Sequence, residues 1–232
     1  MSKVCLITGV GPGTGTALVR RFVEGGYQVA MLARSVERLQ ALQTELSHTH
    51  SYPCDVADTQ ALTDTFNQIK AELGAPSIVV HNAVGAERGT YMQISPDKLR
   101  TAFEINTMAL LELARLATPD MEAAGSGAII CTGNTSAYRG RAKFAGFAPS
   151  KAAQRILLEA IAREAGPKGI HAAYVAIDAV IDLEWTRKAF AGQPDDFFCQ
   201  PADIAEECFR LAHQPRSAWS FESVIRPFGE TW

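Results

Sequence analysis

The sequence predicts an α/β fold, with a doubly wound parallel sheet of about seven strands flanked by helices. Two observations predict it. Short apolar runs alternate along the whole chain with stretches whose apolar side chains repeat at helical spacing, which is typical of parallel β-α-β units. The stretches between them are short, and no internal repeat, low-complexity tract or linker interrupts the alternation. With 232 residues, 47% of them hydrophobic, the chain is long enough for one domain, 1–232, with a large core.

The first half of the chain supplies four strands and three helices. An apolar run at residues 3–8 ends in glycines, and residues 14–24 then repeat apolar side chains at helical spacing. Ser35 and Asp58 precede two further helical patterns and can cap them, because their side-chain oxygens accept hydrogen bonds from free backbone N–H groups. The remaining elements expected in this half are strands at 28–33, 51–54 and 77–81 and helices at 36–46 and 59–73.

The second half continues the alternation. Pro96, Pro149 and Pro201 each mark a helix start, because the first turn of a helix tolerates a missing N–H group. The elements expected here are helices at 96–118, 149–165 and 201–213 and strands at 127–132, 171–176 and 220–226. We expect residues 183–200 to form a lid over the substrate. Its aromatic side chains favour an apolar or aromatic substrate, although packing within the lid explains them equally well: Trp185, Phe190, Phe197 and Phe198.

The bulk composition excludes several classes of function. A net charge of −3 offers no general attraction to nucleic acid or to an anionic membrane surface, and no stretch approaches the roughly 18 apolar residues of a membrane span. The five cysteines are odd in number and lack C-x-x-C spacing, so we expect buried free thiols in a cytoplasmic protein. The five histidines show no metal-ligand spacing, and we expect no metal site.

A glycine-rich loop joins the first strand to the first helix. It reads Thr8-Gly9-Val10-Gly11-Pro12-Gly13-Thr14-Gly15. Glycines let the backbone turn tightly and approach a pyrophosphate, while the following helix offers free N–H groups and the positive end of its dipole. A tight turn without a ligand is the alternative explanation, but the strand before and the helix after favour a dinucleotide. The sequence therefore predicts a Rossmann-type site at the carboxyl ends of the strands.

An ordered set of motifs resembles one protein family, the short-chain dehydrogenase/reductases. The motifs are Thr8-Gly9-x-x-x-Gly13-x-Gly15, Asp55-Val56, His81-Asn82-Ala83-Val84-Gly85, Asn106 and Pro201-Ala-Asp-Ile-Ala. The resemblance implies a nicotinamide dinucleotide as cofactor and a small carbonyl or alcohol as substrate. It also implies a set of cofactor-binding residues: Thr8, Gly9, Gly11, Gly13, Thr14, Gly15, Asp55, Val56, Asn82, Ala83, Lys151 and Ile181.

The residue after the second strand distinguishes the two nicotinamide cofactors. An acidic residue there holds the ribose 2′-hydroxyl of NAD, whereas a basic residue receives the 2′-phosphate of NADP. Ala33 takes the acidic position here and Arg34 follows it, and a guanidinium binds phosphate through two N–H groups. A solvated arginine at a helix start is the alternative, and Pro12 replaces a second basic residue that many NADP-binding members carry. We expect NADP(H), with NAD(H) as the alternative cofactor.

The catalytic positions depart from the family pattern. Phe147-Ala-Pro-Ser-Lys151 stands where the family carries Tyr-x-x-x-Lys, and the same register puts Asn134 at the serine position. The resemblance implies that Lys151 orients the nicotinamide ribose, that Asn106 holds a water and that Asn134 meets the substrate oxygen. Phe147 has no hydroxyl and is expected to be a wall of the pocket. Tyr138 is the candidate for a displaced phenol, although a plain pocket or surface tyrosine fits as well.

The sequence thus predicts an NADP(H)-dependent short-chain oxidoreductase with an atypical catalytic tetrad, acting on a carbonyl or alcohol substrate. It resembles a divergent branch of the family that keeps the lysine and carries Phe in place of the tyrosine. The alternative is a catalytically silent NADP-binding subunit or sensor. The helices at 96–118 and 149–165 resemble the family's interface helices. We therefore expect a homodimer or homotetramer. Leu110, Leu111, Ile156 and Leu157 provide apolar surface on these helices, although some of them must face the sheet.

Overall fold

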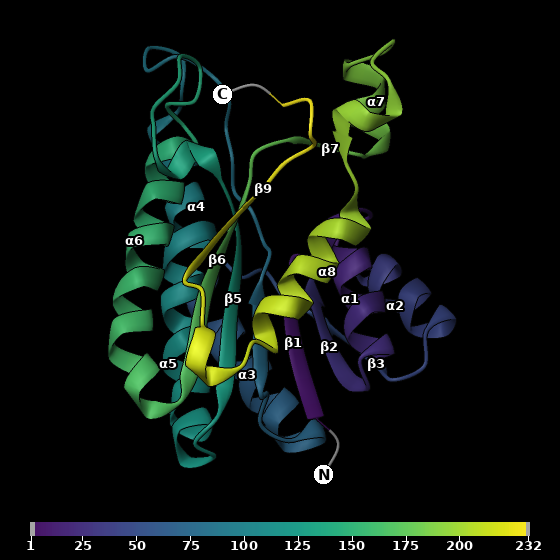
Figure 1. Cartoon of the computed structure of the whole chain (residues 1–232), viewed down its shortest axis with the longest axis vertical. Helices are drawn as coiled ribbons and strands as arrows, with labels where there is room; N and C mark the ends of the chain where they lie inside the picture. The colour runs from purple at the N-terminus through teal and green to yellow at the C-terminus, as the bar shows by residue number, and fades with distance from the viewer. Residues whose placement is uncertain (1–2, 231–232) are drawn as a thin grey trace.

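A seven-stranded parallel sheet forms the centre of the molecule and confirms the predicted α/β fold (Figure 1). The computed structural model describes residues 3–230. The strands follow the order β3-β2-β1-β4-β5-β6-β9, and the chain direction of the connections reverses between β1 and β4. Ligands of doubly wound sheets bind at such a switch point. The strands are β1 Lys3–Thr8, β2 Tyr27–Ala33, β3 Thr49–Pro53, β4 Ile78–His81, β5 Gly127–Asn134, β6 Ile170–Ile177 and β9 Glu222–Ile225.

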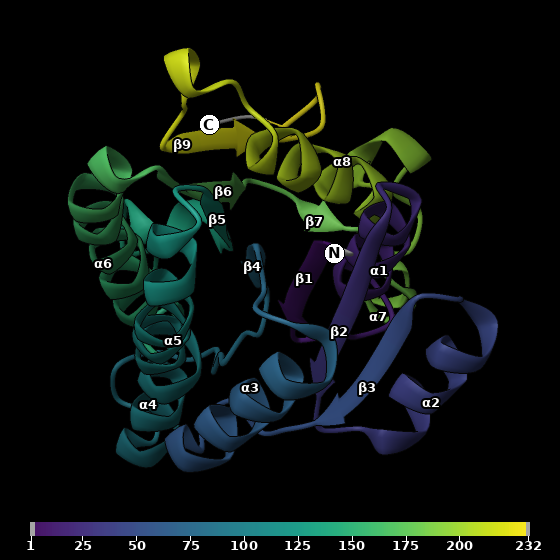
Figure 2. The same cartoon turned by 90° about the horizontal axis from the view of Figure 1, so that it is seen from below.

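Helices cover both faces of the sheet (Figure 2). The helices α3 to α6 lie on one face and α1, α2 and α8 on the other. Two predicted caps are confirmed, since Ser35 Oγ accepts from Arg38 N at 3.4 Å and Asp58 Oδ1 accepts from Ala61 N at 3.0 Å. The bounds are α1 Thr14–Glu24, α2 Val36–Glu45, α3 Thr59–Leu73, α4 Pro96–Phe103, α5 Ala109–Ala123, α6 Ala148–Ala165, α7 Glu184–Ala189 and α8 Pro201–Ala212.

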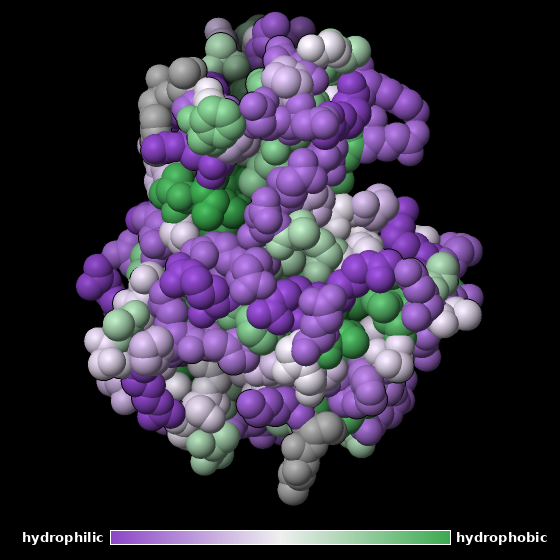
Figure 3. All heavy atoms as spheres, turned by 45° about the vertical axis from the view of Figure 1, so that its right-hand side comes forward, coloured by the Kyte–Doolittle hydropathy of each residue, from purple (hydrophilic) through white to green (hydrophobic). Residues whose placement is uncertain are grey.

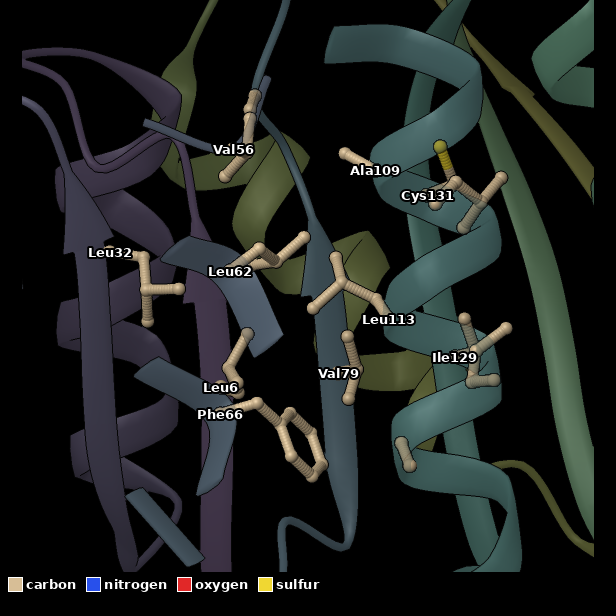
Figure 4. Packing of buried hydrophobic residues seen from close by; sticks show 14 of the residues in the cluster. Leu6, Leu32, Val56, Leu62, Phe66, Val79, Ala109, Leu113, Ile129 and Cys131 are labelled. Carbon is tan, nitrogen blue, oxygen red and sulfur yellow. The ribbon is translucent and has the colours of Figure 1, made fainter. Parts of the chain in front are cut away.

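Two layers of apolar side chains, one on each face, hold the helices to the sheet. On one face, Leu6, Val79 and Ile129 of neighbouring strands meet side chains of α3 and α5, among them Phe66 and Leu113 (Figure 4). The opposite layer joins the strands to α1, α2 and α8. Because the centre of the sheet is buried on both faces, inner strands such as β4 and β6 are nearly continuous apolar runs, whereas the edge strands β3 and β9 are partly exposed.

The helix expected at 96–118 differs from the observed one. A π-helical turn, Glu104–Met108, interrupts it between α4 and α5, and α5 ends later than predicted. This turn contains Asn106, which is fully buried. Leu110 is also fully buried in the core, so it is one of the named apolar residues that face the sheet. Ile156 on α6 does offer apolar surface, because 59% of it is exposed.

Residues 183–200 form a lobe around α7, at the upper right of Figure 1. The short strands β7 Val180–Ile181 and β8 Phe198–Cys199, which the sequence did not predict, pair with each other at the two ends of this lobe. Inside the lobe, the guanidinium of Arg187 contacts Asp182 at 2.6 and 2.7 Å and Asp195 at 2.6 Å. The strand pair joins the two ends of the lobe, and Arg187 links Asp182 to Asp195, although the Asp195 carboxylate is 93% exposed and its ion pair adds little stability.

The aromatic side chains of this lobe have two different surroundings. The ring centroids of Phe190 and Phe197 lie 5.7 Å apart, and those of Phe197 and Phe198 lie 5.0 Å apart. Packing within the lobe therefore explains these three phenylalanines. Trp185, in contrast, is 58% exposed and lines the large cleft of the molecule.

Three further observations bear on the expectations from composition. All five cysteines are free and buried, as predicted. No helix within residues 3–230 is long and apolar enough to cross a membrane. In the same part of the chain, no three His, Cys, Asp or Glu side chains gather in a way that could hold a metal ion.

Candidate active site

A cleft of about 880 Å³ opens at the carboxyl ends of β1, β2, β4 and β5. The surface view shows a narrowing between the upper part of the molecule and its body, with a cluster of hydrophobic residues at its left side (Figure 3). Most of the residues implied by the resemblance line this cleft: Gly9, Gly11, Gly13, Thr14, Gly15, Arg34, Asp55, Val56, Asn82, Ala83, Asn134, Phe147, Lys151 and Ile181. The structure therefore brings together residues that lie far apart in the sequence.

Steric contacts explain two of the loop glycines. Gly9 has a φ of +70°, and a Cβ on it would lie 2.5 Å from the backbone of Ala83. A Cβ on Gly15 would lie 2.5 Å from Gly9 O and 2.7 Å from Val10 Cα. The loop thus packs against backbone on both sides, and α1 begins directly behind it with its N-terminus at the cleft.

Buried hydrogen bonds connect Thr8, at the start of the glycine loop, to the end of β4. His81 Nε2 lies 3.0 Å from Ile105 O and so carries the proton, which leaves Nδ1 to accept from Thr8 Oγ1 at 2.9 Å. Thr8 Oγ1 in turn accepts from the backbone N–H groups of Asn82 and Ala83 at 3.2 and 3.3 Å. Burial lowers the pKa of His81 to about 3, so the ring is neutral at ordinary pH. Thr8 is therefore not among the residues that line the cleft, and its hydroxyl instead holds the end of β4 beside the glycine loop.

Asn82 connects the three central strands at the cleft. Its Nδ2 donates to Gly9 O at 2.9 Å, and its Oδ1 accepts from Thr132 Oγ1 at 2.9 Å. Both ends of the amide are engaged with protein. Asn82 therefore holds the glycine loop against β5, in addition to lining the cleft.

The far end of the cleft carries two arginines rather than one. Arg34 lines it together with Ser35 and Arg38. Ser35 caps α2 between them, so Arg34 precedes the helix and Arg38 lies in its first turn. The sequence reasoning found Arg34 and missed Arg38, although its position in the first turn of the capped helix was a usable signal.

Lys151 lies at the inner end of the cleft and is almost fully buried. Its ammonium donates to Thr132 O at 3.3 Å and to Gln154 Oε1 at 2.9 Å, and it lies 6.0 Å from the ring centroid of Phe147. Burial disfavours the charged form and lowers the pKa of Lys151. The phenyl ring therefore forms the wall beside the lysine where a phenol would bring a hydroxyl.

The amide of Asn134 is partly used by its own surroundings. Its Nδ2 donates to Ile177 O at 3.0 Å and its Oδ1 accepts from Ser136 N at 2.7 Å. The backbone N–H of Asn134 donates to the buried hydroxyl of Tyr174 at 3.2 Å. One N–H of the side-chain amide remains for a ligand in the cleft.

Two predicted catalytic residues lie away from the cleft lining. Asn106 is fully buried; its Nδ2 donates to Gly85 O at 2.8 Å and to Ser150 Oγ at 2.9 Å, and its Oδ1 accepts from Gly85 N at 3.0 Å. Tyr138 is 41% exposed and its hydroxyl donates to Glu222 on β9. The structure does not bring Tyr138 among the residues that line the cleft.

The chain resembles proteins of known class. Residues 3–190 match the sequence profile of the family described as short chain dehydrogenase. The 3alpha-hydroxysteroid dehydrogenase of Mediterraneibacter gnavus is 29% identical over 182 residues, which cover 75% of this chain and 72% of that protein. The 7alpha-hydroxysteroid dehydrogenase of Escherichia coli is 26% identical over 98% of this chain and 93% of that protein. A solved metagenomic short-chain oxidoreductase in complex with NADP is 25% identical, with a TM-score of 0.84 over 97% of each chain.

Proposed function

The chain belongs to the short-chain dehydrogenase family, and from this premise we propose that it is an NADP(H)-dependent oxidoreductase with an atypical catalytic tetrad, acting on a carbonyl or alcohol substrate. One observation carries the proposal: a complete dinucleotide cleft ends at a buried lysine whose aromatic neighbour, Phe147, lacks a hydroxyl. We assign the chain to a branch of the family that keeps Lys151 and carries Phe in place of the tyrosine. NADPH, when bound, supplies the hydride.

Different residues of the cleft are assigned to different parts of the cofactor. The glycine loop and the N-terminus of α1, which line the cleft, would hold the pyrophosphate, and Asp55 and Val56 would contact the adenine. Lys151 orients the nicotinamide ribose, and the backbone of Ile181 receives the carboxamide. Asn134 offers its remaining N–H to the substrate oxygen. Assembly as a homodimer or homotetramer stays a prediction, which the exposed Ile156 supports.

The substrate end of the cleft favours an apolar compound. Around Phe147, the cleft lining includes the apolar side chains of Val84, Ile105 and Trp185. The relatives named as hydroxysteroid dehydrogenases support the same choice, because a steroid is a rigid apolar molecule. We therefore propose a rigid apolar or aromatic carbonyl compound, or the corresponding alcohol, as the substrate class.

The second candidate is a catalytically silent NADP-binding subunit or sensor. The missing phenol at Phe147 and the largely engaged amide of Asn134 favour it, because both positions serve charge that develops on the substrate. Both candidates require the same cofactor-binding residues. They differ in whether the protein transfers hydride from the cofactor to a carbonyl compound.

We expect wild-type protein to transfer deuterium from 4-deuterated NADPH to a reactive apolar diketone, slowly but measurably above a protein-free reaction. Mass spectrometry of the alcohol product detects this step directly and is insensitive to slow background oxidation of NADPH. Lys151→Met is the control, because it leaves the diketone pocket apolar and removes the ammonium beside the cofactor. Tight NADPH binding without any labelled product from a panel of carbonyl compounds would favour the silent candidate.

We expect Arg34→Ala and Arg38→Ala each to lower NADPH affinity about 10- to 100-fold and to leave NADH affinity nearly unchanged. Each guanidinium would make charge-assisted hydrogen bonds to the 2′-phosphate, which NADH lacks. Fluorescence titration with both cofactors measures the effect. Arg20→Ala, on the exposed side of α1 and paired with Glu45, is the matched control for loss of one positive charge. Equal losses for the two cofactors would remove the argument for NADP.

A further inference from the structure

Gln154 occupies a buried position between the cleft lysine and the π-helical turn. It is fully buried on α6, three residues after Lys151, so the two side chains share a helix face. Gln154 Oε1 accepts from Lys151 Nζ at 2.9 Å, and Gln154 Nε2 donates to Asn106 O at 2.7 Å. One amide thus bridges the ammonium to the main chain of another helix.

The two partners fix the orientation of this amide. Asn106 O can only accept a hydrogen bond, and the Lys151 ammonium can only donate one. The amide nitrogen must therefore face Asn106, and the amide oxygen must face Lys151. Two further contacts hold α6 to the π turn, since Thr107 Oγ1 donates to Ser150 O at 3.1 Å and Asn106 Nδ2 donates to Ser150 Oγ at 2.9 Å. The contacts between α6 and the π turn thus hold Gln154 Oε1 in position to accept a hydrogen bond from Lys151.

We propose that Gln154 is a positioning residue that holds the Lys151 ammonium at the inner end of the cleft by linking it to the backbone carbonyl of Asn106. The proposal concerns the lysine side chain itself, and its role in cofactor binding rests on the proposed function. Both acceptors of the ammonium, Gln154 Oε1 and Thr132 O, are amide oxygens. Amide oxygens accept hydrogen bonds but are too weakly basic to take up the lysine's proton. Lys151 therefore does not pass a proton to Gln154 through this contact.

The charge of Lys151 depends on this bond because the remaining surroundings are neutral. The ionisable groups facing it are Cys131 on β5 and His81 on β4. Burial raises the pKa of Cys131 to about 12, and that of His81 falls to about 3. Neither group titrates between about pH 6 and 10, so a titration seen at Lys151 in that window belongs to Lys151. A hydrogen bond to the charged form raises the pKa of the lysine.

The test compares the titration of Lys151 in wild type, Gln154→Leu and Gln154→Glu. The Lys151 Cε resonance, assigned by its loss in Lys151→Met, is followed by NMR against pH in cofactor-free protein. Gln154→Leu keeps the size of the side chain and removes the acceptor, so we expect the midpoint to fall by about one to two pH units. Gln154→Glu places a carboxylate beside the ammonium and moves the midpoint upward. Gln60→Leu, on the exposed face of α3, is the control and leaves the midpoint unchanged.

Opposite shifts in the two variants are the signature of positioning through the Lys151 bond. A common midpoint in all three proteins, or shifts in the same direction, would overturn the proposal. If Gln154→Leu does not fold, the upward shift in Gln154→Glu decides alone. NADPH titration of the same proteins then separates the two proposals. Loss of NADPH affinity in Gln154→Leu above its lysine midpoint connects the bond to the cofactor, whereas failure of wild type to bind NADPH would defeat the proposed function and leave the NMR result standing.

Discussion

Gly15→Ala is expected to destabilise the folded protein by about 3 kcal/mol and to abolish binding of NADPH. The added Cβ would lie 2.5 Å from Gly9 O and 2.7 Å from Val10 Cα, and both atoms belong to backbone that cannot turn away. Relief requires a shift of the loop, and the loop also carries the N–H groups offered to the pyrophosphate. Thermal melting of the cofactor-free protein should show Tm lowered by about 6–12 °C.

Gly11→Ala is the matched control for this substitution. It lies in the same loop, but its Cβ would meet nothing closer than Gly9 O at 3.9 Å, which is an ordinary contact. We expect its Tm in the absence of cofactor to equal that of wild type. Equal Tm values for the two variants would show that the loop does not pack as described.

Local signals were sufficient for the strands and long helices of the fold. Apolar runs marked the strands, and caps such as Asp58 marked helix starts, because these depend on residues only a few positions apart. The lobe around α7 has no such signal. A six-residue helix is marginal by itself, and the contact of Arg187 with Asp182 together with the pairing of β7 and β8 holds it in place. The π-helical turn Glu104–Met108 also has no local signal, because the apolar side chains continue at helical spacing through the expected 96–118 helix.

The candidate site was predictable where its residues form motifs, and not where they contact distant parts of the chain. The glycine loop and Lys151 belong to motifs with fixed spacing. Gln154, in contrast, takes its role from Asn106, 48 residues away. Tyr138 was expected near the cleft, but its hydroxyl partner Glu222 lies 84 residues further along the chain. Pairing between β6 and β9 brings that carboxylate to it, and no local pattern encodes such a contact.

Replacing Phe147 by Tyr and Asn134 by Ser together is expected to raise the turnover of a reactive apolar diketone at least 100-fold while changing NADPH affinity little. A positioned proton donor contributes about 10²–10⁴-fold to such a step, and a hydrogen-bond donor at the developing charge contributes a further factor. Phe147 already lines the cleft beside Lys151, so we expect a hydroxyl on its ring to reach the oxygen of the proposed substrate. Serine also retains the ability to cap the turn at Ser136.

The single variants and the pH profile identify the source of the gain. Phe147→Tyr alone should give most of the increase in turnover, because it restores the proton donor that the wild-type site lacks. Its kcat should fall as pH rises through the pKa of the new phenol, a loss that wild type cannot show. Tyr138→Phe, whose parent hydroxyl donates to Glu222 outside the cleft lining, is the control and is expected to leave wild-type turnover unchanged. A rapid wild-type reaction that disappears in Tyr138→Phe would contradict this assignment and make Tyr138 the proton donor. An unimproved double variant that binds NADPH normally would instead indicate that the cleft does not hold a carbonyl substrate in position for hydride transfer.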